Sequence, residues 1–455
     1  MAKTNENMQS LHDKTIVAWA TALGRSGVAV LRISGAQADE LLLYLGVTAL
    51  PAPRIATLVK LYHPDTRLPI DHCLCLRFPA PHSFTGESVV ELHTHGSLAV
   101  TELLTNLLIA HPSCRLAEPG EFSRRAFHNQ KMDLIQAEGL ADLIDAETEA
   151  QHRQAMRQMQ GEVGHHYHSF RTRIIEAMAM MEAYIDFPDE DIPEHVTEHA
   201  NHLIRSLKSD IELAMADRGI GEKIRGGLTA VIVGAPNVGK SSLVNALAKR
   251  DVAIVSEEAG TTRDTIEIHL NLDGFSVTLI DTAGLRHTNQ QVEAEGIRRA
   301  KEKAQHSDIK IAVFDIVTNQ KLDSETLGII DDNTLIVVNK SDQFSQSALP
   351  ASIAGRTPLL VSAATGDGLE ALIQSLKDIT QQMMTSHHTP IITRARHREA
   401  LSYALSRLDA FLNGGPLELI TEDLRSAAFA IGKITGKIEV DDILDVVFGS
   451  FCIGK

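Results

Sequence analysis

The chain has 455 residues, of which 44% are apolar and 22% charged, and its formal net charge is −16 at pH 7. This length suits about two to four domains, and the negative charge argues against indiscriminate nucleic-acid binding, because phosphate contacts need lysine and arginine. No apolar run approaches the roughly 18 residues of a membrane span, and the polar segment Met1–Lys14 resembles neither a signal nor a transit peptide. We therefore expect a cytoplasmic protein without a membrane anchor.

Residues 15–120 alternate strand-like and helical patterns. Strand-like runs occur at Thr15–Ala20, Gly27–Ile33, Cys73–Phe78 and Ser88–His93, with helical stretches near 36–46 and 97–110. This order predicts an α+β domain. The chain has four cysteines and no C-x-x-C spacing, so we interpret Cys73, Cys75 and Cys114 as structural thiols.

Apolar residues recur at helical spacing from Met132 to about Arg218, and the same texture resumes from Arg398 to Phe451. The second stretch is too short to build a core of its own. The two stretches therefore predict one helical bundle into which another domain is inserted. Linkers are expected near Gly221–Gly227 and Ser386–Pro390.

Two basic clusters interrupt the acidic chain. They comprise Arg153, Arg157, Arg171 and Arg173, and three arginines within Thr393–Arg398. Two interpretations stay open: local contacts to RNA, or a solvated helix face on which arginine side chains lie along the surface.

The octet Gly234–Ser241 reads Gly-Ala-Pro-Asn-Val-Gly-Lys-Ser. It lies between a strand-like run, Ala230–Val233, and a helical pattern that begins at Ser242. This context predicts a phosphate-binding loop, in which backbone N–H groups face the phosphates, Lys240 reaches the β- and γ-phosphates and Ser241 ligates Mg²⁺.

Three more motifs follow strand-like runs in order. The run Val277–Ile280 delivers Asp281 beside the Mg²⁺, Leu335–Val338 delivers Asn339-Lys-Ser-Asp342, and Pro358–Val361 leads to Ser362-Ala-Ala364. The Asp342 carboxylate suits the N1–H and N2–H₂ edge of guanine, which adenine lacks. Strand ends of an α/β sheet meet at one edge, so residues of about 225–380 are predicted to bind GTP as substrate.

The expected GTP-binding residues come from all four motifs and from the intervening switch segment. They are Asn237, Val238, Gly239, Lys240, Ser241, Ser242, Ser256, Glu257, Glu258, Ala259, Gly260, Thr261, Thr262, Asp281, Thr282, Ala283, Gly284, Asn339, Lys340, Asp342, Ser362, Ala363 and Ala364. Of these, Ser241 and Thr262 are the expected Mg²⁺ ligands.

Leu285 follows Gly284, at the place where Ras-like GTPases carry the glutamine that orients the attacking water. Leucine cannot orient water, so either the protein hydrolyses GTP slowly or another group takes this role, and Glu293 and Glu295 are the nearest candidates. The Asn237 amide beside the phosphates suits either a bound monovalent cation in place of an arginine finger or an ordinary turn. The tail contains Cys452, which is either a reactive thiol or part of a frayed end, and it lacks the spacing needed for prenylation.

Seven segments together resemble the MnmE (TrmE) family of tRNA-modification GTPases, and the resemblance spans the chain. They are Thr15-Ile-Val-Ala, Leu31-Arg-Ile-Ser-Gly35, Ser83-Phe-Thr-Gly-Glu87, Glu118-Pro-Gly-Glu-Phe-Ser123, Lys131-Met-Asp-Leu-Ile-Gln-Ala-Glu138, Gly260-Thr-Thr-Arg-Asp264 and Phe451-Cys-Ile-Gly-Lys455.

This resemblance implies a multidomain α/β and α protein with an inserted Ras-like P-loop GTPase domain. The implied division is an α+β N-terminal domain (1–125) that binds folate and dimerises, a discontinuous helical domain (126–222 and 383–455) and the GTPase domain (223–382). It further implies a homodimer through the N-terminal domain, and a heterotetramer with the flavoprotein MnmG (GidA).

The resemblance also implies an activity and its cofactors. With MnmG, the protein is expected to add an aminomethyl or carboxymethylaminomethyl group to C5 of the wobble uridine of certain tRNAs, using 5-formyl- or 5,10-methylene-tetrahydrofolate, Mg²⁺ and K⁺. The implied folate residues are Arg32, Glu91, Lys131 and Lys455, and the implied K⁺ residues are Asn237, Ser256, Glu258 and Thr261. Glu293 is expected to position the catalytic water, and Cys452 is expected to act in catalysis.

A ribosome-assembly GTPase that binds rRNA is the alternative. Such proteins share the GTPase motifs and often lack the glutamine. They need neither a folate domain nor a Cys-Ile-Gly-Lys tail, so these two features distinguish the alternatives.

Overall fold

The computed structural model describes residues 14–186, 195–254, 267–281, 303–315, 322–343, 351–385, 389–438, 444, 447–449 and 451–454. The chain forms two compact units. The first unit comprises the described residues of 1–141, 158–168 and 431–455, and the second those of 142–157 and 169–430.

The first unit is built on a six-stranded sheet of order β3-β4-β5-β2-β1-β6. Its neighbours are antiparallel except β1 and β6, which are parallel. The strands are β1 (Thr15–Trp19), β2 (Ser26–Ser34), β3 (Thr57–Tyr62), β4 (Pro69–Phe78), β5 (Val89–Gly96) and β6 (Cys114–Leu116). This α+β domain confirms the expected strands and adds β3 and β6.

Helices α2 (Ala38–Tyr44) and α3 (Leu98–Ala110) accompany this sheet. The core between them and the strands uses the alternation of β2 and β5, whose Leu31, Ile33, Val90 and Leu92 are buried. Cys73, Cys75 and Cys114 belong to the same core as free thiols. Their buried positions agree with the structural role expected of them.

Helices α4 and α5 and the C-terminal segment of the first unit bring together distant parts of the chain. Helix α4 (Glu121–His128) is followed by α5 (Leu134–Ile144), and a cluster of Leu134, Ala137, Leu444, Phe448 and Phe451 unites α5 with the C-terminal segment. Ile453 then pairs with Pro119 in an antiparallel bridge. The end of the described chain thus packs on residues near its beginning.

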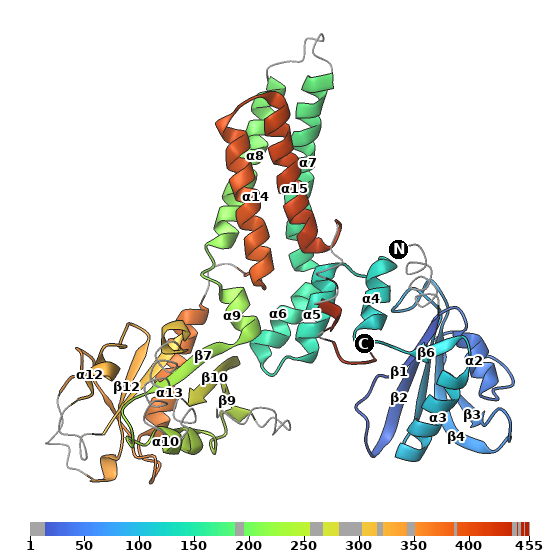
Figure 1. Cartoon of the computed structure of the whole chain (residues 1–455), viewed down its shortest axis with the longest axis horizontal. Coiled ribbons are helices and arrows are strands. Elements are labelled where there is room, and N and C mark those ends of the chain that lie inside the picture. The colour runs from blue at the N-terminus through green and yellow to red at the C-terminus, as the bar shows by residue number, and fades with distance from the viewer. Residues whose placement is uncertain are drawn as a thin grey trace, which may run out of the picture. The chain divides into compact units, whose positions relative to one another are not determined.

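The second unit contains several long helices. They are α6 (Glu149–Met159, up to residue 157), α7 (Glu162–Asp186, from residue 169 onward), α8 (His195–Met215), α14 (Ala395–Asn413) and α15 (Leu417–Thr435, up to residue 430). Helices α7, α8, α14 and α15 lie side by side (Figure 1).

Four ion pairs connect these helices in a closed ring, which agrees with a bundle formed from two separate stretches. They are Arg173–Asp210 from α7 to α8, Lys208–Asp409 from α8 to α14, Arg407–Asp423 from α14 to α15, and Arg425–Glu182 from α15 back to α7.

The second unit also contains a seven-stranded sheet of order β13-β12-β11-β7-β10-β9-β8. Strands β13, β12, β11, β7 and β10 are parallel, whereas β9 and β8 run antiparallel to their neighbours. The strands are β7 (Leu228–Val233), β8 (Ala253–Ile254), β9 (Glu267–Leu272), β10 (Phe275–Asp281), β11 (Ile309–Phe314), β12 (Thr334–Val338) and β13 (Leu359–Leu360).

Both faces of this sheet are apolar, as a parallel α/β sheet requires. Leu228, Ala230 and Ile232 of β7 face a core that includes helices α10 (Lys240–Leu247) and α13 (Leu369–Met384), while Val231 and Val233 face a second core. The shorter elements are α12 (Ser324–Leu327) and the 3₁₀ helix η2 (Ser341–Gln343).

The linker expected near Gly221–Gly227 is mostly helical, because helix α9 (Ile220–Gly226) occupies it. A side chain at Gly221 would place its Cβ 2.1 Å from the Ile392 carbonyl oxygen. The chain therefore enters and leaves the seven-stranded domain through two segments in direct contact. The other expected linker, Ser386–Pro390, lies partly outside the described residues.

The two basic clusters are largely paired with acids. Arg153 meets Glu149 at 2.8 Å, Arg394 meets Asp142 at 2.8 Å, and Arg398 meets both Asp217 and Glu222 at 2.7 Å. Arg173 pairs with Asp210 in the same way. For these four arginines, the ion pairs favour a solvated helix face over contacts to RNA.

Candidate functional sites

The phosphate loop connects β7 to α10 and needs glycine at both ends. At Gly234 (φ 157°) an added Cβ would lie 2.4 Å from the Val313 oxygen, and at Gly239 (φ 95°) it would lie 2.2 Å from Asn339 Nδ2. Both positions have a backbone conformation that other residues rarely adopt. The two glycines let the loop pass close to β11 and to the Asn339 side chain.

The predicted phosphate ligands lie where this loop enters α10. Lys240, only 6% exposed, donates from Nζ to the Gly234 and Ala235 oxygens at 2.8 and 2.9 Å. The next residue, Ser241, donates from Oγ to Asp281 Oδ2 at 2.6 Å. Asp281 is fully buried at the end of β10, so two motifs 40 residues apart in the chain meet at a pair of oxygen ligands.

The third and fourth motifs join the same strand edge. Asn339 Nδ2 donates to the Val238 oxygen at 2.9 Å, and Asn339 Oδ1 accepts from the Ala363 N–H at 3.1 Å. Ser362 Oγ donates to Asp342 Oδ1 at 2.6 Å. One buried amide therefore connects the phosphate loop to both segments expected to read the base. Ser242 lies in the first turn of α10, and Ala364 in the turn that follows β13.

Asp315, directly after β11, is a residue that the sequence analysis missed. Its carboxylate is 1% exposed and lies 2.6 Å from Lys340 Nζ. The signal was an aspartate at the end of the apolar run Ile309–Phe314, a strand that carries none of the expected motifs.

Several predicted site residues lie outside the described residues, and their assignments stay predictions. They are Ser256, Glu257, Glu258, Ala259, Gly260, Thr261, Thr262, Thr282, Ala283, Gly284, Glu293 and Lys455.

In the first unit, Arg32 and Glu91 face each other across β2 and β5. Arg32 Nε donates to Glu91 Oε1 at 2.9 Å, and the Arg32 guanidinium carbon lies 5.7 Å from the ring centroids of both Phe84 and Phe122. The Phe84 ring comes from the loop after β4 and the Phe122 ring from the first turn of α4, and cation–π attraction favours this arrangement. Two of the expected folate residues therefore form one charged pair between aromatic rings.

Lys131 lies beside the loop between β4 and β5. Its Cε is 3.2 Å from where a Cβ of Gly86 would be, so it packs beside the loop that carries Phe84. Gly454 (φ 106°) packs on the Trp19 oxygen, where an added Cβ would lie at 2.2 Å, and Ala18 is paired with Arg32 across β1 and β2. The described part of the tail therefore ends beside β1, the neighbour of the strand that carries Arg32. The Cys452 thiol in this tail is exposed.

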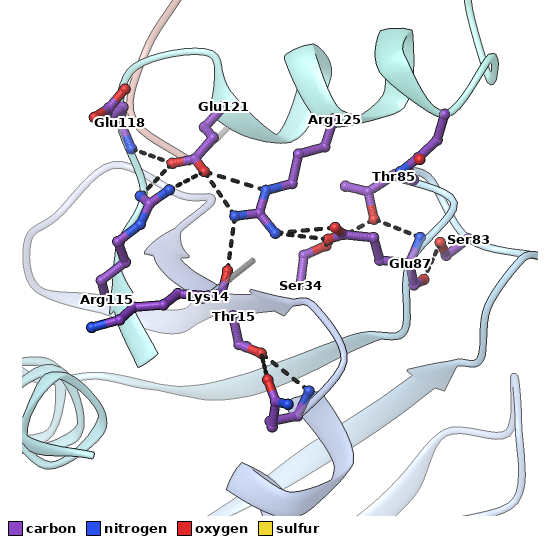
Figure 2. A network of polar contacts seen from close by, with 12 residues as sticks. Lys14, Thr15, Ser34, Ser83, Thr85, Glu87, Arg115, Glu118, Glu121 and Arg125 are labelled. Carbon is purple, nitrogen blue, oxygen red and sulfur yellow. Dashed lines mark hydrogen bonds and ion pairs between the residues drawn. The ribbon is translucent and has the colours of Figure 1, made fainter. Parts of the chain in front are cut away.

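A polar network holds the Phe84 loop in place (Figure 2). Arg125 of α4, 7% exposed, donates to Glu121 at 2.8 Å, to Glu87 at 3.0 Å and to the Lys14 oxygen at 2.9 Å. Glu87 also accepts from the buried Ser34 hydroxyl at 2.8 Å. The network links the Ser83–Glu87 and Glu118–Ser123 motifs.

Glu121 is the most enclosed acid of this network. It accepts two hydrogen bonds from Arg115, at 2.6 and 2.7 Å, and one from the Glu118 N–H at 2.9 Å. Burial alone would raise the pKa of Glu121, but these bonds and Arg125 lower that pKa below its usual 4.5. The acid is therefore charged at neutral pH.

Among the described residues, no group of three or more histidine, cysteine, aspartate or glutamate side chains has the geometry of a metal site. His93 and His95 instead lie near separate carboxylates, Glu91 at 3.7 Å and Asp71 at 2.8 Å. No helix in the described part of the chain has both the length and the apolar character needed to cross a bilayer.

A phosphate loop at the head of a mostly parallel sheet, with the remaining motifs at the same strand edge, defines a P-loop GTPase. Residues 15–131 match the family GTP-binding protein TrmE N-terminus, and residues 134–452 match the MnmE helical domain. The chain belongs to the tRNA modification GTPase MnmE family.

Individual relatives extend along the whole chain. The sequence is 48% identical over 442 residues to the tRNA modification GTPase MnmE of Paramagnetospirillum magneticum, covering 97% of this chain and 100% of that protein. The MnmE of Parvibaculum lavamentivorans is 46% identical over 446 residues, with 97% and 100% covered. Of the two alternatives left open by the sequence, the family is thus the tRNA-modification GTPase.

Solved structures match part of the chain. The G domain of the T. maritima FeoB iron transporter is 24% identical, covering 34% of this chain and 99% of that one, with a TM-score of 0.26. Era of Aquifex aeolicus is 20% identical, covering 41% and 68%, with a TM-score of 0.26.

Proposed function

We propose that this chain is a potassium-activated GTPase that, together with the flavoprotein MnmG, modifies C5 of the wobble uridine of tRNA with a one-carbon unit from tetrahydrofolate. The observation that carries the proposal is that one chain contains two sites of different chemistry. One is the strand edge where the nucleotide motifs meet, and the other is the Arg32–Glu91 pair between aromatic rings. The proposed domains are 1–125, 126–222 with 383–455, and 223–382.

The nucleotide is assigned by the chemistry of each motif. Lys240 neutralises the β- and γ-phosphates, and Asp342 accepts the guanine N1–H and N2–H₂. Ser241 and Asp281 supply oxygen at one point, which suits Mg²⁺, a hard cation that prefers oxygen ligands. Mg²⁺ would hold the phosphates and neutralise developing charge there, with Thr262 as a further ligand.

Potassium activation is assigned to Asn237, whose exposed side chain lies on the phosphate loop in a left-handed conformation (φ 62°). Its amide oxygen, with oxygens of Ser256, Glu258 and Thr261, would suit a monovalent cation. Such a cation stabilises the charge that an arginine finger otherwise neutralises, an effect of about 10³ to 10⁵ in rate. Glu293 takes the place of the missing glutamine in orienting water, and pairing of two GTPase domains closes the switch loop over the cation.

Hydrolysis rates in matched KCl and NaCl test this mechanism. We expect fast turnover only in KCl, because carbonyl and amide oxygens replace the hydration shell of K⁺ better than that of the smaller Na⁺. Asn237→Ala should lose the stimulation and keep nucleotide binding, whereas Glu293→Ala should keep K⁺-dependent pairing and lose turnover. Equal rates in the two salts would refute the cation mechanism.

Folate is assigned to Arg32, Glu91, Lys131 and Lys455, since the glutamate tail of the cofactor needs cations and the pterin needs a carboxylate. Calorimetry with 5-formyltetrahydrofolate should show binding weakened by about 2 kcal/mol or more in Arg32→Ala and in Glu91→Ala, because a charged hydrogen bond is lost. Arg54→Ala is the matched control, since Arg54 lies over a different ring, Phe78, in the same domain. Equal affinity in all four proteins would remove Arg32 and Glu91 from the site.

The cellular reaction is tested by mass spectrometry of tRNA nucleosides. Cells lacking the protein should lose the C5-modified wobble uridine, and cells lacking MnmG should lose the same nucleoside. Unchanged nucleosides in the first strain would refute the proposed substrate.

A further inference from the structure

Asp315 is a nearly inaccessible carboxylate at the edge where the nucleotide motifs meet. Its side chain is 1% exposed and pairs with Lys340 Nζ at 2.6 Å. Strands β11 and β12 are parallel neighbours, with Phe314 opposite Val338, so Asp315 and the Asn339–Asp342 motif leave the sheet at adjacent points. A charge buried at this depth is costly unless it is paired, and the ion pair with the Lys340 ammonium offsets part of that cost.

Lys340 makes a second contact, with the phosphate loop. Its Nζ donates to the Asn237 main-chain oxygen at 3.2 Å. Both residues have left-handed backbones, at φ 63° for Lys340 and 62° for Asn237. Asparagine adopts this conformation more readily than other residues with a side chain, whereas it is uncommon for lysine, and here the two residues are hydrogen-bonded to each other.

We propose that Asp315 is a positioning residue which, through Lys340, couples recognition of the base to the shape of the phosphate loop. Asp315 fixes the ammonium, the ammonium fixes the Asn237 carbonyl, and the Asn237 side chain is thereby presented toward the phosphates. The coupling rests on the proposed assignment of the base to Asp342 and of the monovalent cation to Asn237.

Asp315→Asn tests this proposal because it keeps the size of the side chain and removes its charge. Release of N-methylanthraniloyl-GDP should become about ten-fold faster, the effect of losing a charge-assisted hydrogen bond. The K⁺ concentration for half-maximal hydrolysis should rise in the same variant. A variant that merely loosens the domain would melt at a lower temperature with no change in its K⁺ requirement.

Asp331→Asn is the matched control. Asp331 pairs with Lys310, at the opposite end of strand β11, so this variant also removes an ion pair from β11 but leaves the nucleotide edge intact. The proposal is overturned if Asp315→Asn and Asp331→Asn release the nucleotide at the same rate and need the same K⁺ concentration.

A second background separates action through Lys340 from any other effect. In Lys340→Gln, nucleotide release should already be fast, and adding Asp315→Asn should change it no further; a further acceleration would contradict the proposed path. Should Asp315→Asn fail to fold, Lys340→Gln alone decides, and wild-type release in that variant would overturn the proposal.

Asp342→Asn is measured in parallel. Unchanged GDP affinity in that variant removes the base assignment, while the Asp315 result still reports on the phosphate loop.

Discussion

Asp342 shows how one hydrogen bond prepares a specificity residue. Ser362 Oγ donates to Asp342 Oδ1 at 2.6 Å, which leaves the other carboxylate oxygen and the remaining lone pairs for a base. The donor is supplied by the segment after β13, so the two predicted base-reading motifs are already connected.

Asp342→Asn should shift preference from GTP to xanthosine triphosphate. The new amide offers an N–H to the 2-oxo group of xanthine, while guanine loses a carboxylate acceptor, a change of about 2 kcal/mol for a charged hydrogen bond. Competition binding with both nucleotides measures the shift. Undiminished GTP affinity would show that Asp342 does not read the base.

The thiols differ in reactivity because burial controls ionisation. Burial raises the pKa of Cys73 to about 12 and those of Cys75 and Cys114 to about 11. At pH 8 the thiolate fraction of these three is about one in a thousand or less. We expect iodoacetamide to label the native protein once, at Cys452, and the unfolded protein four times. Labelling of a second thiol in the folded protein would contradict this expectation.

Cys452→Ser tests the function of the remaining thiol. The side chain is exposed, so the substitution should leave the melting temperature and GTP hydrolysis unchanged while abolishing tRNA modification. Wild-type modification by this variant would make Cys452 an ordinary surface residue.

At the scale of elements, the Arg125 network holds α4, the Phe84 loop and the start of β1 together. Arg125→Met should destabilise the first unit by about 1 to 3 kcal/mol, because half-buried Glu87 loses this ion pair and buried Glu121 keeps only Arg115 of the two arginines. Arg153→Met is the comparison: it removes an exposed pair on one helix and should cost at most about 0.5 kcal/mol. Urea unfolding of both variants measures the difference, and equal losses would refute the importance of burial.

The same network predicts that the stability of the first unit falls at low pH. The pKa of Glu121 is lower in the folded than in the unfolded protein, so its contribution to stability is full above pH 4.5 and is lost as the pH falls through the folded pKa. The wild type should lose stability below that pH more steeply than Glu121→Gln. Parallel pH profiles of the two proteins would contradict the assignment.

Helix α9 offers a test of the contact between the two connecting segments. Gly221→Ala would bring a methyl group 2.1 Å from the Ile392 oxygen, whereas Gly226→Ala meets nothing within 4 Å. The first change should lower the melting temperature by several degrees, at about 4 to 8 °C per kcal/mol for a small domain and less for a larger one. The second should be neutral or slightly stabilising, because alanine favours helices. Equal melting temperatures would show that the contact is not tight.

Much of the architecture was accessible from the sequence, and the exceptions have physical reasons. Strand β6 has three residues, too few for any periodicity, and β3 is an edge strand with exposed Leu58 beside a proline-rich stretch. Strand β11 was overlooked because the nucleotide motifs follow other strands, and Asp315 was overlooked with it.

Site geometry depended on contacts between distant segments. The sequence predicted Arg32 and Glu91 through resemblance, but the approach of Phe84 and Phe122 to Arg32 needs a loop and the start of helix α4 to fold onto the same strand. Likewise, no local pattern predicts that Lys340 has a left-handed backbone or that its ammonium meets both Asp315 and the Asn237 oxygen. Periodicity reports which face is buried, and it does not report which side chains meet.

At the scale of the whole molecule, each unit is assembled from separated pieces of chain. Phe448 joins two of these pieces: it is fully buried, its ring lies 6.3 Å from Phe127, and Arg124 lies over it at 5.7 Å. Phe448→Ala should therefore destabilise the first unit by about 3 to 5 kcal/mol. Leu68→Ala, at a site 65% exposed, is the control, and hydrogen exchange of the β1–β5 amides measures both. Unchanged exchange in Phe448→Ala would show that the late segment is not needed by the sheet.

This long-range packing sets an order of events during synthesis. Phe448 and Gly454 rest on Gly120 and Trp19, yet the ribosome must first translate everything from Asp142 to Ala430. At about 5 to 20 residues per second, the nascent N-terminal sheet waits on the order of tens of seconds for the peptide that covers it. Over that interval the apolar surface near Phe127 is available to chaperones. A polypeptide that is truncated before residue 444 would keep this surface exposed to proteases.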